Sequence, residues 1–277
     1  MIAPSEQSAA FLDVPRHGPL SGTLWDVPYR TASVQGERIT LEVDLFLPET
    51  PARQAGAMLV WFHSGAFCTG TRKRPAHRML ARWLNAVGMS VAVPSYRLGS
   101  HETDLDPTLR AALPDLLAQC PPTFRPEMAG PWALAALADS VALLHWLDAQ
   151  RAALGIAGRL VVGGTSAGAI NALNLLHAAP GLGLKTPELG GGFCYSGAFA
   201  YPDLFRPGRA PVFAMHSPHD RRVDIKPIRA LAARDSLIEL IEAPGQTHGG
   251  FTIHPGEKPR DSFARILSRM GPMSGLA

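Results

Sequence analysis

The sequence predicts an α/β protein in which a mostly parallel sheet is covered by helices on both faces. Short apolar runs rich in β-branched residues alternate along the chain with longer segments of helical spacing. Most of these runs are apolar at every position, which is typical of strands buried on both faces. With 277 residues, 46% of them hydrophobic and 18% charged, the chain is large enough for one sizeable core.

The first strands are expected to differ from the rest. We assign residues 1–277 to one domain, with residues 1–22 as an N-terminal extension. Two strands follow, at Thr23–Arg30 and Arg38–Leu47. The second alternates apolar and polar side chains, which predicts an antiparallel strand with one solvated face.

From residue 57 onward, strands and helices alternate. The predicted strands are Ala57–Phe62, Ser90–Pro94, Leu160–Gly163, Gly192–Ser196, Pro211–His216 and Leu237–Glu242. The predicted helices are His77–Val87, Asp139–Leu154, Ala167–Ala179, Ile228–Arg234 and Ser262–Met270. Ligands of such sheets bind beyond the carboxyl ends of the strands, which is where the motifs described below lie.

Residues 100–131 interrupt the alternation. They contain six prolines, with short apolar pieces between them. The segment follows the strand that ends at Pro94, on the ligand side of the sheet, so it is assigned as a small cap-like insertion over the site. A surface excursion is the alternative.

Composition excludes some classes of partner. The net charge is +3, and the only tight basic run is Arg72–Arg74, so we expect no nucleic-acid partner. Cys68, Cys120 and Cys194 are widely spaced, without zinc or redox spacing, which favours free thiols in a reducing compartment.

The sequence also predicts a cytoplasmic protein without a membrane partner. The polar residues Ser5–Gln7 do not fit a signal peptide. The longest apolar run, Ala133–Leu147, is interrupted by Asp139 and His145, so it is not expected to span a membrane. The oligomeric state stays open, a homodimer included.

The segment Leu160–Ile170 carries the strongest signal for chemistry. A buried strand runs into Gly-x-Ser-x-Gly and then into helix-compatible residues. This order predicts a sharp turn that presents Ser166 above the sheet, near the positive end of the next helix. Gly164 and Gly168 have no Cβ to obstruct the turn. A glycine-rich turn with a solvated serine is the alternative.

The loop His63–Phe67 follows the predicted strand Ala57–Phe62. Its small residues allow main-chain N–H groups to face a developing oxyanion, and the loop can supply one or two such donors. Ala167, next to Ser166, would supply another. The alternative is an ordinary strand-to-helix loop.

An acid and a base are expected at two further strand ends. Asp220 follows the strand Pro211–His216, and His248 lies in a glycine-rich loop after the last strand. A serine becomes a good nucleophile when a histidine takes its proton and a carboxylate orients that histidine. The chain order Ser166, Asp220, His248 is the order of a strand-turn-helix serine hydrolase.

Other residues compete for these roles. His219 and His254 are alternative bases, and Asp224 and Asp203 are alternative acids. Asp224 is better explained as a helix N-cap. No cluster of acidic residues and histidines has metal-ligand spacing, so we expect neither a metal nor a cofactor.

These motifs together resemble the α/β-hydrolase family, in its lipase and esterase branch, over residues 38–270. The loop at His63 resembles the His-Gly-Gly-Gly loop of that branch, and Tyr96-Arg97 resembles its Tyr-Arg pair. Asp139 and Trp146 lie where carboxylesterases and arylformamidases often carry an Asp and a Trp.

The resemblance implies an α/β-hydrolase fold and a role for each candidate residue. It implies Ser166 as nucleophile, His248 as base and Asp220 as acid, with an oxyanion hole formed by the N–H groups of Ser64, Gly65 and Ala167. Ser64 departs from the family pattern, because it replaces the first glycine after His63.

The function expected from the sequence is a cofactor-free hydrolase of small-molecule carboxylic esters that works through an acyl-enzyme. An amidase or arylformamidase with the same residues is the first alternative. The second is a binding protein that keeps the fold without turnover.

Overall fold

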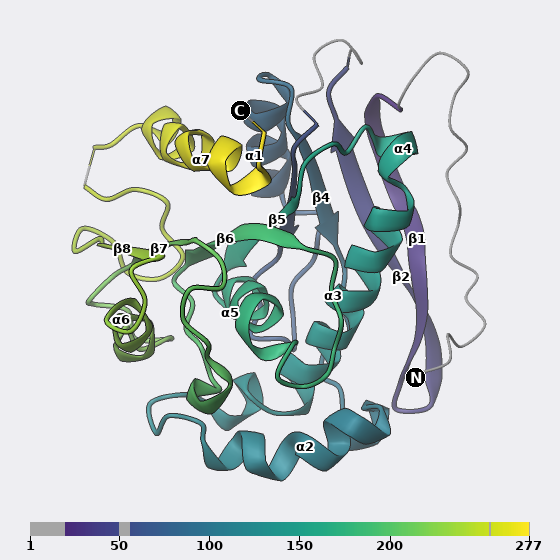
Figure 1. Ribbon diagram of the computed structural model, residues 1–277, viewed down its shortest axis with the longest axis vertical. Helices are drawn as coiled ribbons and strands as arrows, with labels where there is room; N and C mark the ends of the chain where they lie inside the picture. The colour runs from purple at the N-terminus through teal and green to yellow at the C-terminus, as the bar shows by residue number, and fades with distance from the viewer. Residues whose placement is uncertain (1–19, 50–55, 255, 277) are drawn as a thin grey trace.

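The computed structural model describes residues 20–49, 56–254 and 256–276, and in this part of the chain it contains one eight-stranded sheet (Figure 1). The strand order is β1-β2-β4-β3-β5-β6-β7-β8. The strands are β1 Gly22–Val34, β2 Glu37–Leu47, β3 Met58–Phe62, β4 Ser90–Pro94, β5 Leu160–Thr165, β6 Leu189–Tyr195, β7 Val212–His216 and β8 Ile238–Glu242.

Strand pairing agrees with the predicted sheet. β1 pairs with β2, and β2 with β4, in antiparallel register, whereas every later pair is parallel. The prediction of a mostly parallel sheet with antiparallel strands at its start is therefore confirmed. Most of the proposed extension, residues 1–19, lies outside the described residues, and β1 begins at Gly22.

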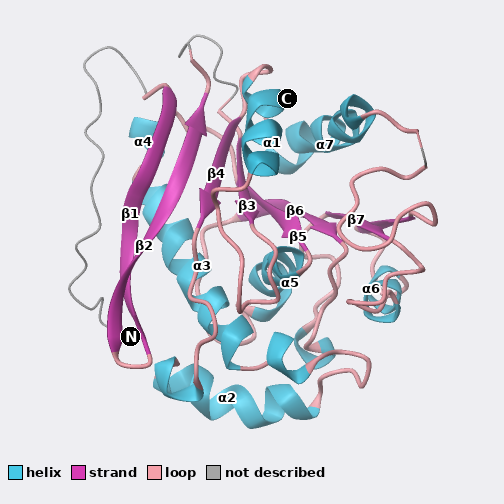
Figure 2. Cartoon of the chain, turned by 180° about the vertical axis from the view of Figure 1, so that it is seen from behind, coloured by secondary structure: helices cyan, strands magenta, loops and turns pink. Residues whose placement is uncertain are grey.

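Helices cover both faces of the sheet (Figures 1 and 2). The helices are α1 Pro75–Asn85, α2 Pro107–Ala118, α3 Pro131–Ala149, α4 Arg151–Leu154, α5 Ala167–Leu173, α6 Lys226–Ala232 and α7 Pro259–Ser274. Short helical turns occur at η2 Glu102–Asp104, η3 Pro126–Met128, η4 Asn174–Ala178 and η5 Pro202–Leu204. Apolar side chains of α3, α5 and α6 belong to one core, and those of α1 and α7 to a second core on the opposite face.

Strand β2 differs from its prediction in its second half. Asp44 is fully buried and Phe46 is 5% exposed, although both belong to the face predicted to be solvated. Arg72 Nε and Lys73 Nζ lie 3.1 and 3.0 Å from Asp44 Oδ1, which compensates the buried charge. Trp25 packs edge-on against Phe46. Contacts with side chains of other segments therefore bury Asp44 and Phe46, although the alternation within β2 predicts that both are exposed.

Helix α3 begins eight residues earlier than predicted, at Pro131, where a proline fits the first helical turn. Apolar side chains surround most of this helix, because it is packed into the core. Among the described residues, one helical stretch, Pro126–Ala149, is long and apolar enough to cross a membrane, and 72% of its most apolar window is buried. Burial in the core explains its composition.

Residues 100–131 fold into η2, α2 and η3 and pack on the core shared with α3. Leu109, Leu113 and Leu116 are buried there. The segment is tied to the sheet by Arg97 Nη1, which donates to the carbonyl of Asp104 at 2.8 Å. It is an ordered helical layer, and its role as a cap stays a proposal.

Candidate active site

The turn between β5 and α5 holds Ser166 in a strained backbone conformation. Its φ is 57° and its ψ is −123°, a region that non-glycine residues rarely adopt. A Cβ at Gly168 would lie 2.0 Å from the carbonyl oxygen of Phe62, and one at Gly164 would lie 2.6 Å from the same oxygen. Both glycines are therefore needed for the turn to pack against the end of β3.

His248 and Asp220 are brought together from two loops that are 28 residues apart. His248 Nδ1 lies 2.7 Å from Asp220 Oδ2, and the Asp220 side chain is fully buried. Asp220 Oδ1 accepts the main-chain N–H groups of Arg222 and Val223 at 2.8 and 3.1 Å. These bonds fix the carboxylate. With the Nδ1 proton directed to Asp220, Nε2 of His248 is left as the acceptor.

The loop that carries His248 has two further anchors. The main-chain N–H of Gly249 donates to Ser196 Oγ at 2.8 Å, and Ser217 Oγ donates to the carbonyl of Gln246. Both serines are buried, with exposed fractions of 3% and 2%. Sequence reasoning did not identify either anchor, because neither forms part of a local motif.

A second imidazole, of His216, lies behind Asp220. His216 Nε2 is 3.4 Å from Asp220 Oδ2 and 3.0 Å from the carbonyl of Val223, while Nδ1 is 3.1 Å from the carbonyl of Gly197. Burial lowers the pKa of His216, so the neutral ring is favoured beside the carboxylate. From the sequence, His216 was predicted only as the last residue of the strand Pro211–His216.

The loop after β3 is held by aromatic and hydrogen-bonding contacts. The Tyr96 hydroxyl donates to the carbonyl of His63 at 2.6 Å, and the two rings stack with centroids 4.2 Å apart. Burial lowers the pKa of His63 to about 4. Gly65 has a φ of 136°, and a Cβ there would lie 1.9 Å from the carbonyl oxygen of Thr69. This loop therefore requires glycine at that position.

The three expected oxyanion donors lie around Ser166. Ser64 and Gly65 line the same cavity as Ser166, and Ala167 is the fully buried first residue of α5. Among the described residues, none accepts a main-chain hydrogen bond from the N–H of Ser64, Gly65 or Ala167. Such free N–H groups are suited to donate to an oxygen atom that becomes negatively charged during a reaction.

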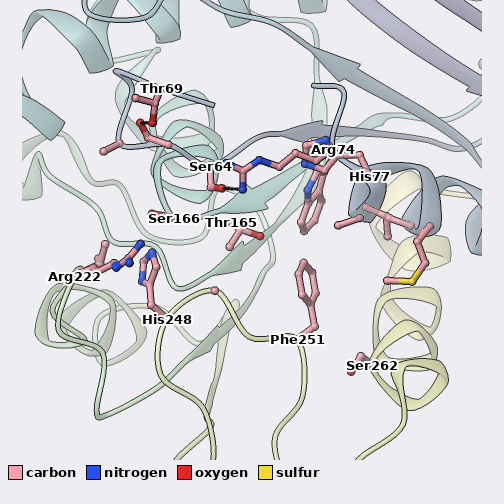
Figure 3. Close-up of a pocket in the computed structure, with 18 of the residues that line it drawn as sticks. Ser64, Thr69, Arg74, His77, Thr165, Ser166, Arg222, His248, Phe251 and Ser262 are labelled. Atoms are coloured by element: carbon pink, nitrogen blue, oxygen red, sulfur yellow. Dashed lines mark hydrogen bonds between the residues drawn. The ribbon is translucent and has the colours of Figure 1, made fainter. Parts of the chain in front are cut away.

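The cavity has a volume of about 730 Å³ and contains Ser166 and His248 in its wall (Figure 3). A large part of the wall is apolar and comes from β3, α1, α7 and the loop after His248. These apolar lining residues are Trp61, Met79, Leu80, Phe251, Phe263 and Ile266. α1 and α7 meet at the cavity, where the rings of Trp83 and Phe263 stack at 4.9 Å.

The competing candidates lie elsewhere. Asp224 Oδ1 accepts the main-chain N–H of Lys226 at 2.8 Å just before α6. The N-cap of α6 is Ile225, so the prediction of Asp224 as the N-cap is wrong by one residue. His219, His254 and Asp203 do not line the cavity. No cluster that could hold a metal ion is found among the residues that the structure describes.

Tyr96 and Asp139 lie in the framework around the site. Asp139 is fully buried and accepts the main-chain N–H and the Nε–H of Arg97, each at 2.9 Å from Oδ2. Arg30 Nη1 lies 2.9 Å from Asp139 Oδ1. This cluster joins the end of β4 to α3 and β1. None of its three residues lines the cavity, so its role is to hold these elements in place around the site.

Comparisons with known proteins find similarity in structure. No protein-family model matches the sequence, and the search of curated proteins finds no match. The apo form of Thermogutta terrifontis esterase 2 has a TM-score of 0.64 and 17% identity, covering 100% of this chain and 99% of that one. The same esterase phosphorylated by paraoxon has a TM-score of 0.63 and 16% identity, covering 96% and 99%.

A propionate-bound esterase from the same organism has a TM-score of 0.62 and 15% identity, and covers 90% of this chain and 94% of that one. These similarities extend over nearly the whole of both chains. Together with the sheet order and the covering helices, they show that the protein has the α/β-hydrolase fold, as the sequence predicts.

Proposed function

We propose that this protein is a serine hydrolase that cleaves carboxylic esters through an acyl-enzyme. One observation carries the proposal. His248 lines the same cavity as Ser166 and is hydrogen-bonded to Asp220, and Ser166 lies on the strained turn between β5 and α5. In this proposal Ser166 is the nucleophile, His248 the general base and Asp220 the acid that orients it.

In the first step, Ser166 Oγ attacks the ester carbonyl while His248 Nε2 takes its proton. The imidazolium that forms is stabilised by the buried carboxylate of Asp220, which stays ionised. The tetrahedral intermediate carries a negative charge on the former carbonyl oxygen. The N–H groups of Ser64, Gly65 and Ala167 would bind that oxygen, and the N-terminal end of α5 adds a favourable partial charge.

In the second step, His248 returns the proton to the leaving alkoxide, and the acyl group remains on Ser166. A water molecule then attacks the acyl carbonyl while His248 accepts its proton. Collapse of the second tetrahedral intermediate releases the carboxylic acid and restores the Ser166 hydroxyl. No step requires a cofactor.

The fold relatives support this chemistry. Thermogutta terrifontis esterase 2 is described as phosphorylated by paraoxon, and the Thermogutta terrifontis esterase Est2 is described with propionate bound. The cavity of about 730 Å³ and its apolar wall favour small or medium acyl groups with an apolar alcohol or aryl partner. We propose that residues 100–131, which contribute Arg125 and Met128 to the cavity, act as a cap on one side.

Labelling with a fluorophosphonate probe tests the proposal directly. We expect the folded wild-type protein to gain one probe, located at Ser166 by mass spectrometry, and Ser166→Ala to gain none. The same preparation should hydrolyse para-nitrophenyl acetate. A folded protein that neither reacts with the probe nor hydrolyses the ester would contradict the proposal and favour a binding role. A matched N-formyl anilide distinguishes ester from amide cleavage.

A further inference from the structure

Three arginines line the cavity that contains Ser166. They are Arg74, before α1; Arg125, before η3; and Arg222, two residues after Asp220. No aspartate or glutamate lines the cavity among the residues that the structure describes. The cavity wall therefore carries three positive charges from three separate segments and no negative charge.

These three charges are uncompensated, in contrast to the arginines of the framework. Arg97 and Arg72 form ion pairs with the buried carboxylates of Asp139 and Asp44. Within the described residues, none of the three cavity arginines has a carboxylate within 4.0 Å. Arg74 Nη1 donates one hydrogen bond, to Ser64 Oγ at 3.2 Å. Most of their donors are therefore free to bind a ligand.

The arginines lie on different sides of Ser166. In Figure 3, Arg74 extends toward Ser64 on one side, and Arg222, from the loop between β7 and α6, lies beside His248 on the other. An anionic group on a substrate bound at Ser166 would thus meet a guanidinium close to the reacting bond. Arg74, Arg125 and Arg222 are all exposed, so their charges reach a ligand in the open part of the cavity, next to the apolar walls formed by Trp61, Phe251 and Phe263.

We infer that this cavity selects esters that carry a second, anionic group, a carboxylate or a phosphate. A guanidinium offers paired donors that match either group. The apolar wall would hold a hydrocarbon or aryl part of the same molecule. This inference rests on the proposed ester hydrolase function, and it adds the substrate class.

The alternative explanation is that the arginines stabilise the developing oxyanion for every substrate alike. Matched substrates separate the two explanations, because only a selective site distinguishes an anionic ester from its neutral analogue. Suitable substrates are meta-acetoxybenzoate, meta-acetoxyphenyl phosphate and the neutral meta-acetoxybenzamide. In these compounds the meta position prevents the added group from attacking the ester.

The experiment compares kcat/KM for each anionic ester with that for the benzamide. We expect the wild-type ratio to be at least about tenfold for one of the anions, because hydrogen bonds to charged groups are the strong ones. The anion with the larger ratio identifies the group. Added salt should lower the ratio, since exposed charges are screened.

Variants assign the effect to residues. Arg74→Gln and Arg222→Gln should lower the ratio toward one, mainly through KM for the anionic ester, with a smaller change for the benzamide. Arg78→Gln and Arg221→Gln are matched controls, because these neighbouring exposed arginines do not line the cavity. Both controls should keep the wild-type ratio.

Two results would overturn the inference. One is a wild-type ratio at or below one for both anions, and the other is an equal loss on charged and neutral esters in the Arg74 and Arg222 variants. In either case the protein would still hydrolyse the acetate ester of meta-acetoxybenzamide and react with the fluorophosphonate, so the proposed function would stand. Absence of both activities would instead contradict the proposed function itself.

Discussion

Two serines directly follow adjacent parallel strands, and both have a positive φ. Ser166 follows β5 with a φ of 57°, and Ser196 follows β6 with a φ of 51°. The main-chain N–H of Ser166 donates to the carbonyl of Tyr195, and that of Ser196 donates to the carbonyl of Met215, each at 2.9 Å. Both are buried, with exposed fractions of 7% and 3%.

The two serines differ in what their hydroxyl groups meet. Ser166 is flanked by glycines that allow a helix to start, and it lines the cavity. The hydroxyl of Ser196 accepts the main-chain N–H of Gly249 and so holds the loop of His248. A strained serine at a strand end is therefore insufficient to identify a nucleophile. The surroundings of the hydroxyl distinguish a reacting group from an anchor.

The largest expected effect separates the two serines by activity. Ser166→Ala should lower kcat by about six powers of ten, because removal of the nucleophile leaves little of the machinery effective. The melting temperature should change little, since alanine keeps the same backbone strain. Ser166→Gly is the matched control for strain. It should be equally inactive and more stable, by about 1–3 kcal/mol. Substantial activity in either pure variant would contradict the nucleophile assignment.

The second largest effect is expected at Asp220, which is hydrogen-bonded to His248 itself. Asp220→Asn should lower kcat by about four powers of ten. The amide group would donate toward His248 Nδ1 and favour the tautomer with the proton on Nε2, which cannot take a proton from Ser166. Steady-state kinetics on para-nitrophenyl acetate measures the loss. Activity within tenfold of wild type, in a folded variant, would remove Asp220 from the mechanism.

Ser196→Ala should have an intermediate effect, because it removes the acceptor of the Gly249 N–H but no reacting group. We expect kcat to fall about fivefold with KM nearly unchanged, as one neutral hydrogen bond contributes about 1 kcal/mol. Ser196→Gly should show the same kinetic change with relaxed strain. An unchanged kcat in both variants would show that the anchor is dispensable.

The smallest effect tests the specificity of the acid assignment. Asp224→Asn should change kcat/KM by less than about twofold and leave the melting temperature nearly constant, because an asparagine side chain can accept the same hydrogen bond from the main-chain N–H of Lys226. Parallel assays with Asp220→Asn provide the comparison. If Asp224→Asn were the more damaging substitution, the acid would have to be reassigned to Asp224.

The comparison also explains which parts of the site could be predicted from the sequence. The turn at Ser166 is a local pattern within Leu160–Ile170, so its strand, glycines and helix are all visible in one segment. The anchor at Ser196 depends on Gly249, which is 53 residues away, and no spacing rule connects them. The same holds for the hydrogen bond between Arg74 and Ser64, which places a basic residue at the cavity.

Long-range contacts account for the errors in the fold as well. The positions of the strands along the chain and their mostly parallel direction follow from the apolar runs, and these were predicted. The burial of Asp44 was not, because it depends on Arg72 and Lys73 from the loop before α1. In residues 100–131, local signals were dominated by proline. The helix α2 there is stabilised by packing of Leu109, Leu113 and Leu116 on the core.

The close approach of the Gly164–Gly168 turn to the carbonyl oxygen of Phe62 has a consequence for how the ligand preference of this protein could change. The two glycines approach a main-chain oxygen of Phe62, so no side chain takes part in this approach. Substitutions elsewhere in the chain therefore leave it unchanged. The relative position of the nucleophile turn and the loop at His63 is therefore insulated from most mutations. The side chains of α1 and α7 that line the cavity are, by contrast, free to vary. Laboratory evolution of this protein should accordingly collect its substrate-changing mutations on those two helices and leave the turn unaltered.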